Sequence, residues 1–73
     1  MKHTLKIGKE YFENLMSGAK TAEVRLNDRD YQLGDMLEFF DYETELYVKF
    51  IVTHIHSGLG LKENYVVLSV KKA

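Results

Sequence analysis

Hydrophobic and polar residues change their spacing near the start of the chain. Residues 3–7 alternate apolar with polar positions, which predicts a first β-strand. The spacing widens after Gly8, where Phe12, Leu15 and Met16 follow one another at i, i+3 and i+4. This spacing predicts a helix over Lys9–Ser17 with one apolar face. A helix of about nine residues does not persist alone in water, so we expect packing to hold it.

Gly18 stands where this helix should end, because glycine adopts the left-handed conformation of a helix C-terminus without steric cost. Strict alternation resumes in residues 21–27 and predicts a second strand. One predicted face of this strand carries Ala22, Val24 and Leu26, and the other carries Thr21, Glu23, Arg25 and Asn27.

Three further strands are predicted in residues 36–42, 46–55 and 65–70. The polar residues 27–30, Gly34 with an expected positive φ, and residues 43–45 form the turns between them. The expected inward residues of the last two strands are Leu46, Val48, Phe50, Val52, Val66, Leu68 and Val70, whereas Ile51 and Ile55 leave the outer face partly apolar.

The predicted order is strand, helix and then four strands, within 73 residues that make a single domain, 1–73. Short connections between consecutive strands favour antiparallel pairing, and five short strands favour closure of the sheet. The predicted fold class is therefore α+β and mainly β. We expect a small β-barrel of about five strands, with one main helix between the first two.

Composition narrows the functional classes. The net charge is −1 and the sequence pI is about 6.3, which argues against strong binding to nucleic acid through bulk charge. The chain has no cysteine, so it has neither disulfides nor a thiolate zinc site. We find no signal peptide and no apolar run long enough to span a membrane, and therefore expect a cytoplasmic protein without a membrane partner.

The candidate functional residues lie where the predicted helix meets the second predicted strand. Lys20 follows the helix end, and Glu23 and Arg25 share one predicted strand face, so the three side chains can meet at one rim. Spacing alone favours a solvated strand face with a weak surface ion pair.

The same residues carry a resemblance to a known family. The pattern Gly18-x-Lys20-x-x-Glu23-x-Arg25 is similar to the G-x-K-x-x-E-x-R motif of the ASCH domain family, which belongs to the PUA-like superfamily. Residues 5–12, 27–35 and 60–70 resemble the flanking elements of a small bacterial and phage-type branch. The resemblance covers nearly the whole chain and implies a compact PUA-like β-barrel.

The resemblance implies an RNA-binding or nucleotide-binding module with a cleft lined by Lys20, Glu23 and Arg25. Arg25 would bind phosphate or a base edge through its planar guanidinium, with Lys20 as a second cation. Glu23 would orient Arg25 or accept a hydrogen bond from an exocyclic amine. Tyr31 or Tyr65 would stack on a base, although packing at the barrel end is the competing role for Tyr31.

Two other functions stay open. One branch of the ASCH superfamily resembles acetylcytidine amidohydrolases, with a lysine at the position of Lys20; here Lys20 and Glu23 would be the catalytic residues. That branch has a threonine at the position of Glu23, which Thr21 does not replace, and its catalytic acid lies in an insertion missing from this chain. The second alternative is a protein-interaction or regulatory module using the outer face at Ile51 and Ile55.

No cofactor motif is present, and none is expected. His54 and His56 share a strand face at i, i+2, a spacing that can suit a metal, and His3 could approach them. No third ligand follows from the spacing, so we predict solvated histidines and no metal site.

Overall fold

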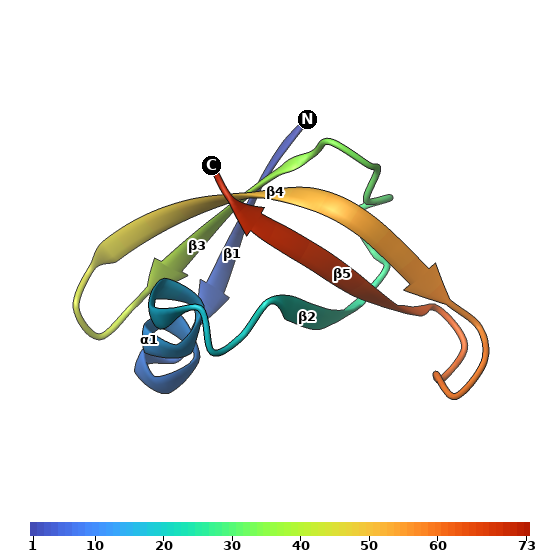
Figure 1. The fold of residues 1–73 in the computed structure, drawn as a ribbon, viewed down its shortest axis with the longest axis horizontal. Helices are drawn as coiled ribbons and strands as arrows, with labels where there is room; N and C mark the ends of the chain where they lie inside the picture. The colour runs from blue at the N-terminus through green and yellow to red at the C-terminus, as the bar shows by residue number, and fades with distance from the viewer.

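The computed structural model describes residues 1–73 and shows a mainly β fold with one helix (Figure 1). All six predicted elements are present, and the helix has the predicted bounds. The elements are β1 (Lys2–Ile7), α1 (Lys9–Ser17), β2 (Ala22–Leu26), β3 (Met36–Asp41), β4 (Leu46–Ser57) and β5 (Tyr65–Lys72). The helix is too short to cross a membrane.

The five strands form one sheet in the order β1-β3-β4-β5-β2. Antiparallel pairing of consecutive strands is confirmed for β3 with β4 and for β4 with β5. It is wrong for β1, which runs parallel to β3. The reason is that α1 and β2 intervene, so the chain returns to β1 in the same direction, and β2 crosses to pair with β5 instead.

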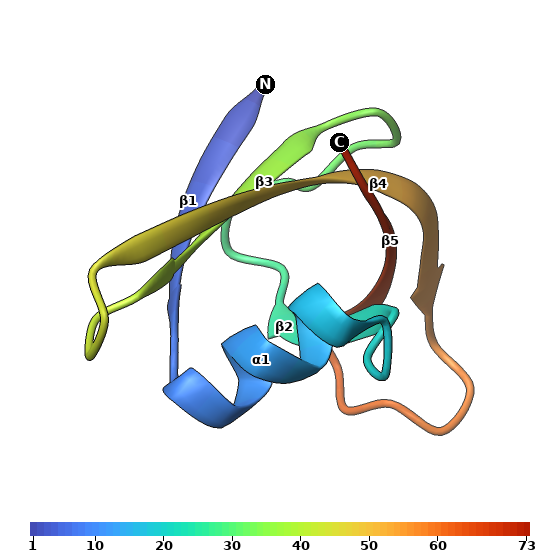
Figure 2. The same ribbon diagram turned by 60° about the vertical axis from the view of Figure 1, so that its left-hand side comes forward.

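The sheet curls into a half-barrel whose edge strands are β1 and β2. Figure 2 shows the curved sheet arching over α1. The two edge strands do not pair through their backbones. Two arginines instead donate to main-chain oxygens of β1: Arg25 of β2 from Nη2 to the Lys6 carbonyl at 3.3 Å, and Arg29 of the loop after β2 from Nη1 to the Thr4 carbonyl at 3.0 Å. Both bonds satisfy carbonyl groups of a strand that has a partner only on its other side.

A single core fills the concave side of the sheet, and the predicted inward residues are confirmed in β1 and β5. From α1, Phe12 and Leu15 complete this core. Its members are Leu5, Ile7, Phe12, Leu15, Tyr31, Leu37, Phe39, Val48, Phe50, Val52, Val66, Leu68 and Val70.

Three predicted positions differ from the structure. Met16 is 44% exposed because the buried face of α1 is narrower than its apolar stripe, and Leu46 is 55% exposed at the hairpin end of β4. Alternation predicts Ile55 on the outer face, but a register shift between Val52 and His54 turns it inward against the core.

Strand β2 presents its polar side to the interior. Glu23 is only 8% exposed, whereas Val24 and Leu26 are 56% and 46% exposed. The register with β5 explains this orientation, since Glu23 lies opposite the buried Leu68 and Arg25 lies opposite the buried Val66. Residues directly opposite each other in an antiparallel pair share one face.

The predicted turns are present, two of them with glycine and the β3–β4 turn without it. Gly18 has φ 82° and its N–H donates to the Leu15 carbonyl at 3.3 Å, closing α1 as predicted. Gly34 also has a positive φ, of 84°.

The β3–β4 hairpin lacks glycine and is instead organised by the buried Asp41. Its carboxylate accepts hydrogen bonds from the Thr44 hydroxyl at 2.7 Å and the Glu43 N–H at 2.9 Å. Burial alone would raise the pKa of Asp41, but these hydrogen bonds outweigh it and lower that pKa.

Candidate functional site

An open cleft of about 540 Å³ lies where the end of β1 and the start of α1 face β2 and β5. It is the largest of three cavities in the structure, and it contains the rim predicted from the sequence. Its walls are formed by Lys6, Ile7, Gly8, Tyr11, Lys20, Glu23, Val24, Arg25, Leu26 and Tyr65.

Glu23 is the centre of the charged group in this cleft. Lys20 Nζ lies 3.1 Å from Glu23 Oε1, and Arg25 Nη2 lies 2.8 Å from Glu23 Oε2. Arg25 Nε also donates to Oε2 at 2.9 Å. One carboxylate therefore holds two cations, and the group of three carries a net charge of +1. We call Lys20, Glu23 and Arg25 the charged triad.

Local structure fixes both cations of the charged triad. The Lys20 N–H donates to the Asn14 carbonyl at 3.0 Å, which ties the residue to the end of α1. Its ammonium also lies 5.7 Å from the ring centroid of Tyr11, within cation–π range. Arg25 is held at its other end by the Lys6 carbonyl across the gap between β1 and β2.

The cations keep hydrogen-bonding capacity for a ligand. The side chains of Lys20 and Arg25 are 25% and 26% exposed, against 11% for Glu23. The bonds of Arg25 use Nε and Nη2, so the two N–H groups of Nη1 have no partner within the protein. The cleft therefore presents donors to solvent and keeps its carboxylate underneath them.

The structure brings together three of the four predicted site residues. The charged triad forms, and the interpretation of Glu23 and Arg25 as a solvated strand face is wrong for Glu23. Tyr31 is 4% exposed in the core and is not part of the cleft wall. The aromatic residues of the cleft are Tyr65, one of the two tyrosines that the sequence analysis names for stacking, and Tyr11 of α1, which it does not name. Its position next to the apolar stripe of α1 was the available signal.

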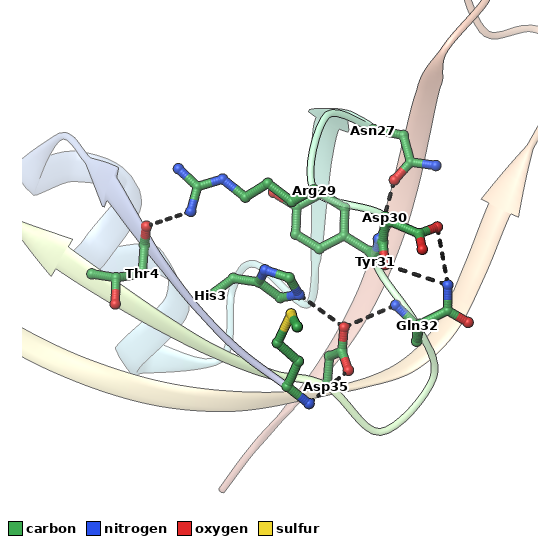
Figure 3. Close-up of polar contacts among 9 residues, drawn as sticks. His3, Thr4, Asn27, Arg29, Asp30, Tyr31, Gln32 and Asp35 are labelled. Carbon is green, nitrogen blue, oxygen red and sulfur yellow. Dashed lines mark hydrogen bonds and ion pairs between the residues drawn. The ribbon is translucent and has the colours of Figure 1, made fainter.

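A second polar cluster lies at the opposite end of β1 and surrounds Tyr31 (Figure 3). The buried His3 and Tyr31 pack edge to face, with ring centroids 4.9 Å apart. His3 Nε2 lies 2.8 Å from Asp35 Oδ2, which also accepts from the Gln32 N–H at 3.0 Å. The N-terminal ammonium of Met1 donates to Asp35 Oδ1 at 3.1 Å.

These contacts lower the pKa of Asp35 to about 2. Burial acts in the opposite direction and would raise it, but the hydrogen bonds from His3, the Gln32 N–H and the N-terminus outweigh burial. For Tyr31 the balance is reversed: burial raises the pKa of its phenol despite the nearby cations Arg29 and Arg25. The cluster anchors the loop before β3 to β1. Sequence patterns could not predict this role, because His3 and Asp35 are 32 positions apart in the chain.

The three histidines do not come together. His54 and His56 are exposed, and His3 contacts Asp35 rather than either of them. The structure contains no group of three or more histidine, aspartate or glutamate side chains arranged to hold a metal ion.

Fold and cleft together define a class: a small, mainly β half-barrel with a charged cleft at the gap between its edge strands. The chain belongs to the family described as "Domain of unknown function (DUF3850)", whose model matches residues 2–70. It is similar in fold to the structure titled "Crystal structure of hypothetical protein PH0355", with a TM-score of 0.72 and 19% sequence identity over 100% of both chains. No curated protein matches the sequence.

Proposed function

We propose that this chain is an ASCH-like, PUA-like module that binds RNA or a nucleotide in the cleft formed by the charged triad. The observation that carries the proposal is the convergence of two partly exposed cations, Lys20 and Arg25, on one buried carboxylate beside two tyrosine rings. The likeness of Gly18, Lys20, Glu23 and Arg25 to the ASCH motif supports the same ligand class.

Each part of the cleft suits one part of a nucleotide. Arg25 offers the free Nη1 donors of a planar fork, and Lys20 adds a compact ammonium, which together fit a phosphate group. Tyr11 is 57% exposed and Tyr65 is partly exposed, so both offer ring surface to a base. Glu23 fixes both cations in place before a ligand arrives, which reduces the conformational entropy lost on binding.

The net charge of the whole chain is consistent with recognition by the cleft alone. A net charge of −1 leaves no general attraction for polyanions, so recognition has to come from a few well-placed groups. We therefore expect preferential binding of particular nucleotides or single strands rather than indiscriminate coating of nucleic acid.

Amidohydrolase activity on acylated cytidine-type nucleosides is the alternative. Lysine-dependent attack requires a neutral amine, whereas Lys20 Nζ is held 3.1 Å from a carboxylate oxygen as an ion pair. No observation in the cleft favours catalysis over binding, and the same experiment separates them.

The test is a comparison of wild type with Lys20→Ala and Arg25→Lys. Isothermal titration with the four ribonucleoside monophosphates measures binding, and liquid chromatography of acetylcytidine measures deacylation. We expect Arg25→Lys to weaken nucleotide binding about tenfold or more, because an ammonium cannot reproduce the bidentate guanidinium. Lys20→Ala should lower affinity by a smaller factor.

Lys62→Ala is the matched control, since it removes an exposed lysine that does not line the cleft. Wild-type deacylation that Lys20→Ala abolishes would replace the proposal with the amidohydrolase. Nucleotide affinity that is unchanged in both cleft variants would refute a role for the charged triad in binding.

A further inference from the structure

We infer that the outer face of the β3–β4 hairpin is a base-stacking platform that extends the cleft, so that the ligand is a single-stranded nucleic acid rather than a mononucleotide. The inference rests on the proposed function, because it takes the cleft as one end of the binding path. Its centre is an aromatic pair, the partly buried Phe40 on β3 and the exposed Tyr47 on β4.

The sheet register places this pair beside the cleft. Phe40 is the partner of Tyr47 across β3 and β4 and of Lys6 across β1 and β3. Lys6 also lines the cleft, and its carbonyl accepts the hydrogen bond from Arg25. Lys6, Phe40 and Tyr47 thus form one row across the outer face, spanning about 10 Å at the usual strand spacing.

The aromatic pair offers surface of the kind that unpaired bases use. The two ring centroids are 4.7 Å apart with 34° between the ring planes. Tyr47 is 58% exposed, and so is Tyr42, which follows β3. Such a pair on an exposed sheet face contributes to hairpin stability, yet it leaves most of Tyr47 in water. Aromatic side chains stack on any base, since every base has a π-face.

Charge on the same face fits a phosphate backbone. Lys2, Lys6, Lys49 and Lys71 all lie at outward positions of their strands. The same outward positions include one acid, Glu38, whose side chain is 14% exposed. Its carboxylate contacts Lys2 Nζ at 3.5 Å and accepts from the Thr4 hydroxyl at 3.3 Å. The opposite surface of these strands is the apolar core, so their lysines and their exposed aromatic rings share this side.

The experiment compares ligands of different length. Isothermal titration measures the affinities of AMP and UMP, and fluorescence anisotropy measures those of labelled octa-adenylate and octa-uridylate RNA and of the matching DNA. We expect the octamers to bind more tightly than the mononucleotides. Tyr47→Ser should weaken octamer binding about five- to a hundredfold, the range of one lost base stack, and leave AMP and UMP unchanged. Tyr47→Phe should retain octamer affinity, because it keeps the ring.

Two measurements distinguish a loss of binding from a folding defect in Tyr47→Ser. Circular dichroism reports whether the variant keeps its β structure. Independently, ultraviolet cross-linking of a 4-thiouridine octamer to the wild-type protein should label the peptide that contains Tyr47, as mapped by mass spectrometry.

The outcomes separate the two claims. Octamer affinity that Arg25→Lys reduces and Tyr47→Ser does not would overturn the platform and leave the proposed function standing. Octamer binding that depends on Tyr47 but not on Arg25 would support the platform and reject the cleft. Absence of binding by all probes would reject both. If sedimentation shows a wild-type dimer that Tyr47→Ser dissociates, with no effect on octamers, the face is a protein interface and the inference is wrong.

Discussion

Replacing Glu23 with glutamine should lower stability and raise phosphate affinity in the same protein. The side chain keeps its size but loses the charge that holds Lys20 and Arg25 at 3.1 and 2.8 Å. Both effects follow from the position of one carboxylate beneath two cations, and their opposite signs make the prediction specific.

The magnitude follows from how far each ion pair is shielded from solvent. Exposed pairs contribute about 0–1 kcal/mol each, whereas breaking a buried pair costs about 3–5 kcal/mol. Glu23 is buried but its partners are about one quarter exposed, which places the loss near the exposed limit, at about 1–2 kcal/mol for both pairs. For a domain of this size that is a fall in Tm of about 5–15 °C.

Thermal unfolding followed by circular dichroism, in 0.05 and 1 M NaCl, measures this loss. The difference from wild type should shrink at high salt, because the partners are within reach of screening ions. Glu13→Gln on the exposed side of α1 is the control, since Glu13 forms no ion pair, and its Tm should stay close to that of wild type. A Glu23→Gln variant that melts within 1 °C of wild type would refute the reasoning.

Binding of UMP tests the predicted rise in phosphate affinity. Glutamine holds the two cations less firmly, but it removes the negative charge next to the phosphate donors. We expect the electrostatic gain to be the larger effect, so UMP should bind more tightly to Glu23→Gln than to wild type. AMP should gain less, because the amide oxygen of glutamine is a weaker acceptor than the carboxylate for its exocyclic amine. Equal weakening for both nucleotides would show that Glu23 acts only by holding the cations in place.

Further predictions concern the core, the second polar cluster and binding by the cleft. Leu15→Ala should cost about 2–5 kcal/mol in urea unfolding, because Leu15 is 2% exposed, whereas Met16→Ala next to it should cost under about 0.5 kcal/mol. The depressed pKa of Asp35 stabilises the fold above the ordinary carboxyl pKa, so this contribution should be lost as pH falls from about 4 towards 2. Urea unfolding between pH 2 and 5 should show a weaker pH dependence in Asp35→Asn than in wild type or in the exposed control Asp28→Asn. Any RNA binding should have a shallow salt slope, measured by anisotropy, because few cations line the cleft; a steep slope would indicate bulk electrostatics.

The sequence predicted the parts of the site that depend on short-range geometry. Gly18 ends the helix, and Lys20 and Glu23 are only three residues apart, so the junction of α1 and β2 brings them together in any fold that keeps both elements. Arg25 follows at the strand period of two and therefore shares the side of Glu23. The same local rules predicted the bounds of α1 and the inward residues of β5.

Long-range pairing decided the rest. Alternation defines two faces of β2 but not which one is buried, and only the register with β5 turns Glu23 inward and leaves Val24 exposed. The same limit applies to the aromatic residues. Tyr31 is fixed in the core by His3, 28 positions earlier in the chain, whereas Tyr11 reaches the cleft because α1 packs beneath the curled sheet. Sequence periodicity carries the spacing along each element, and the tertiary structure alone sets which elements become neighbours.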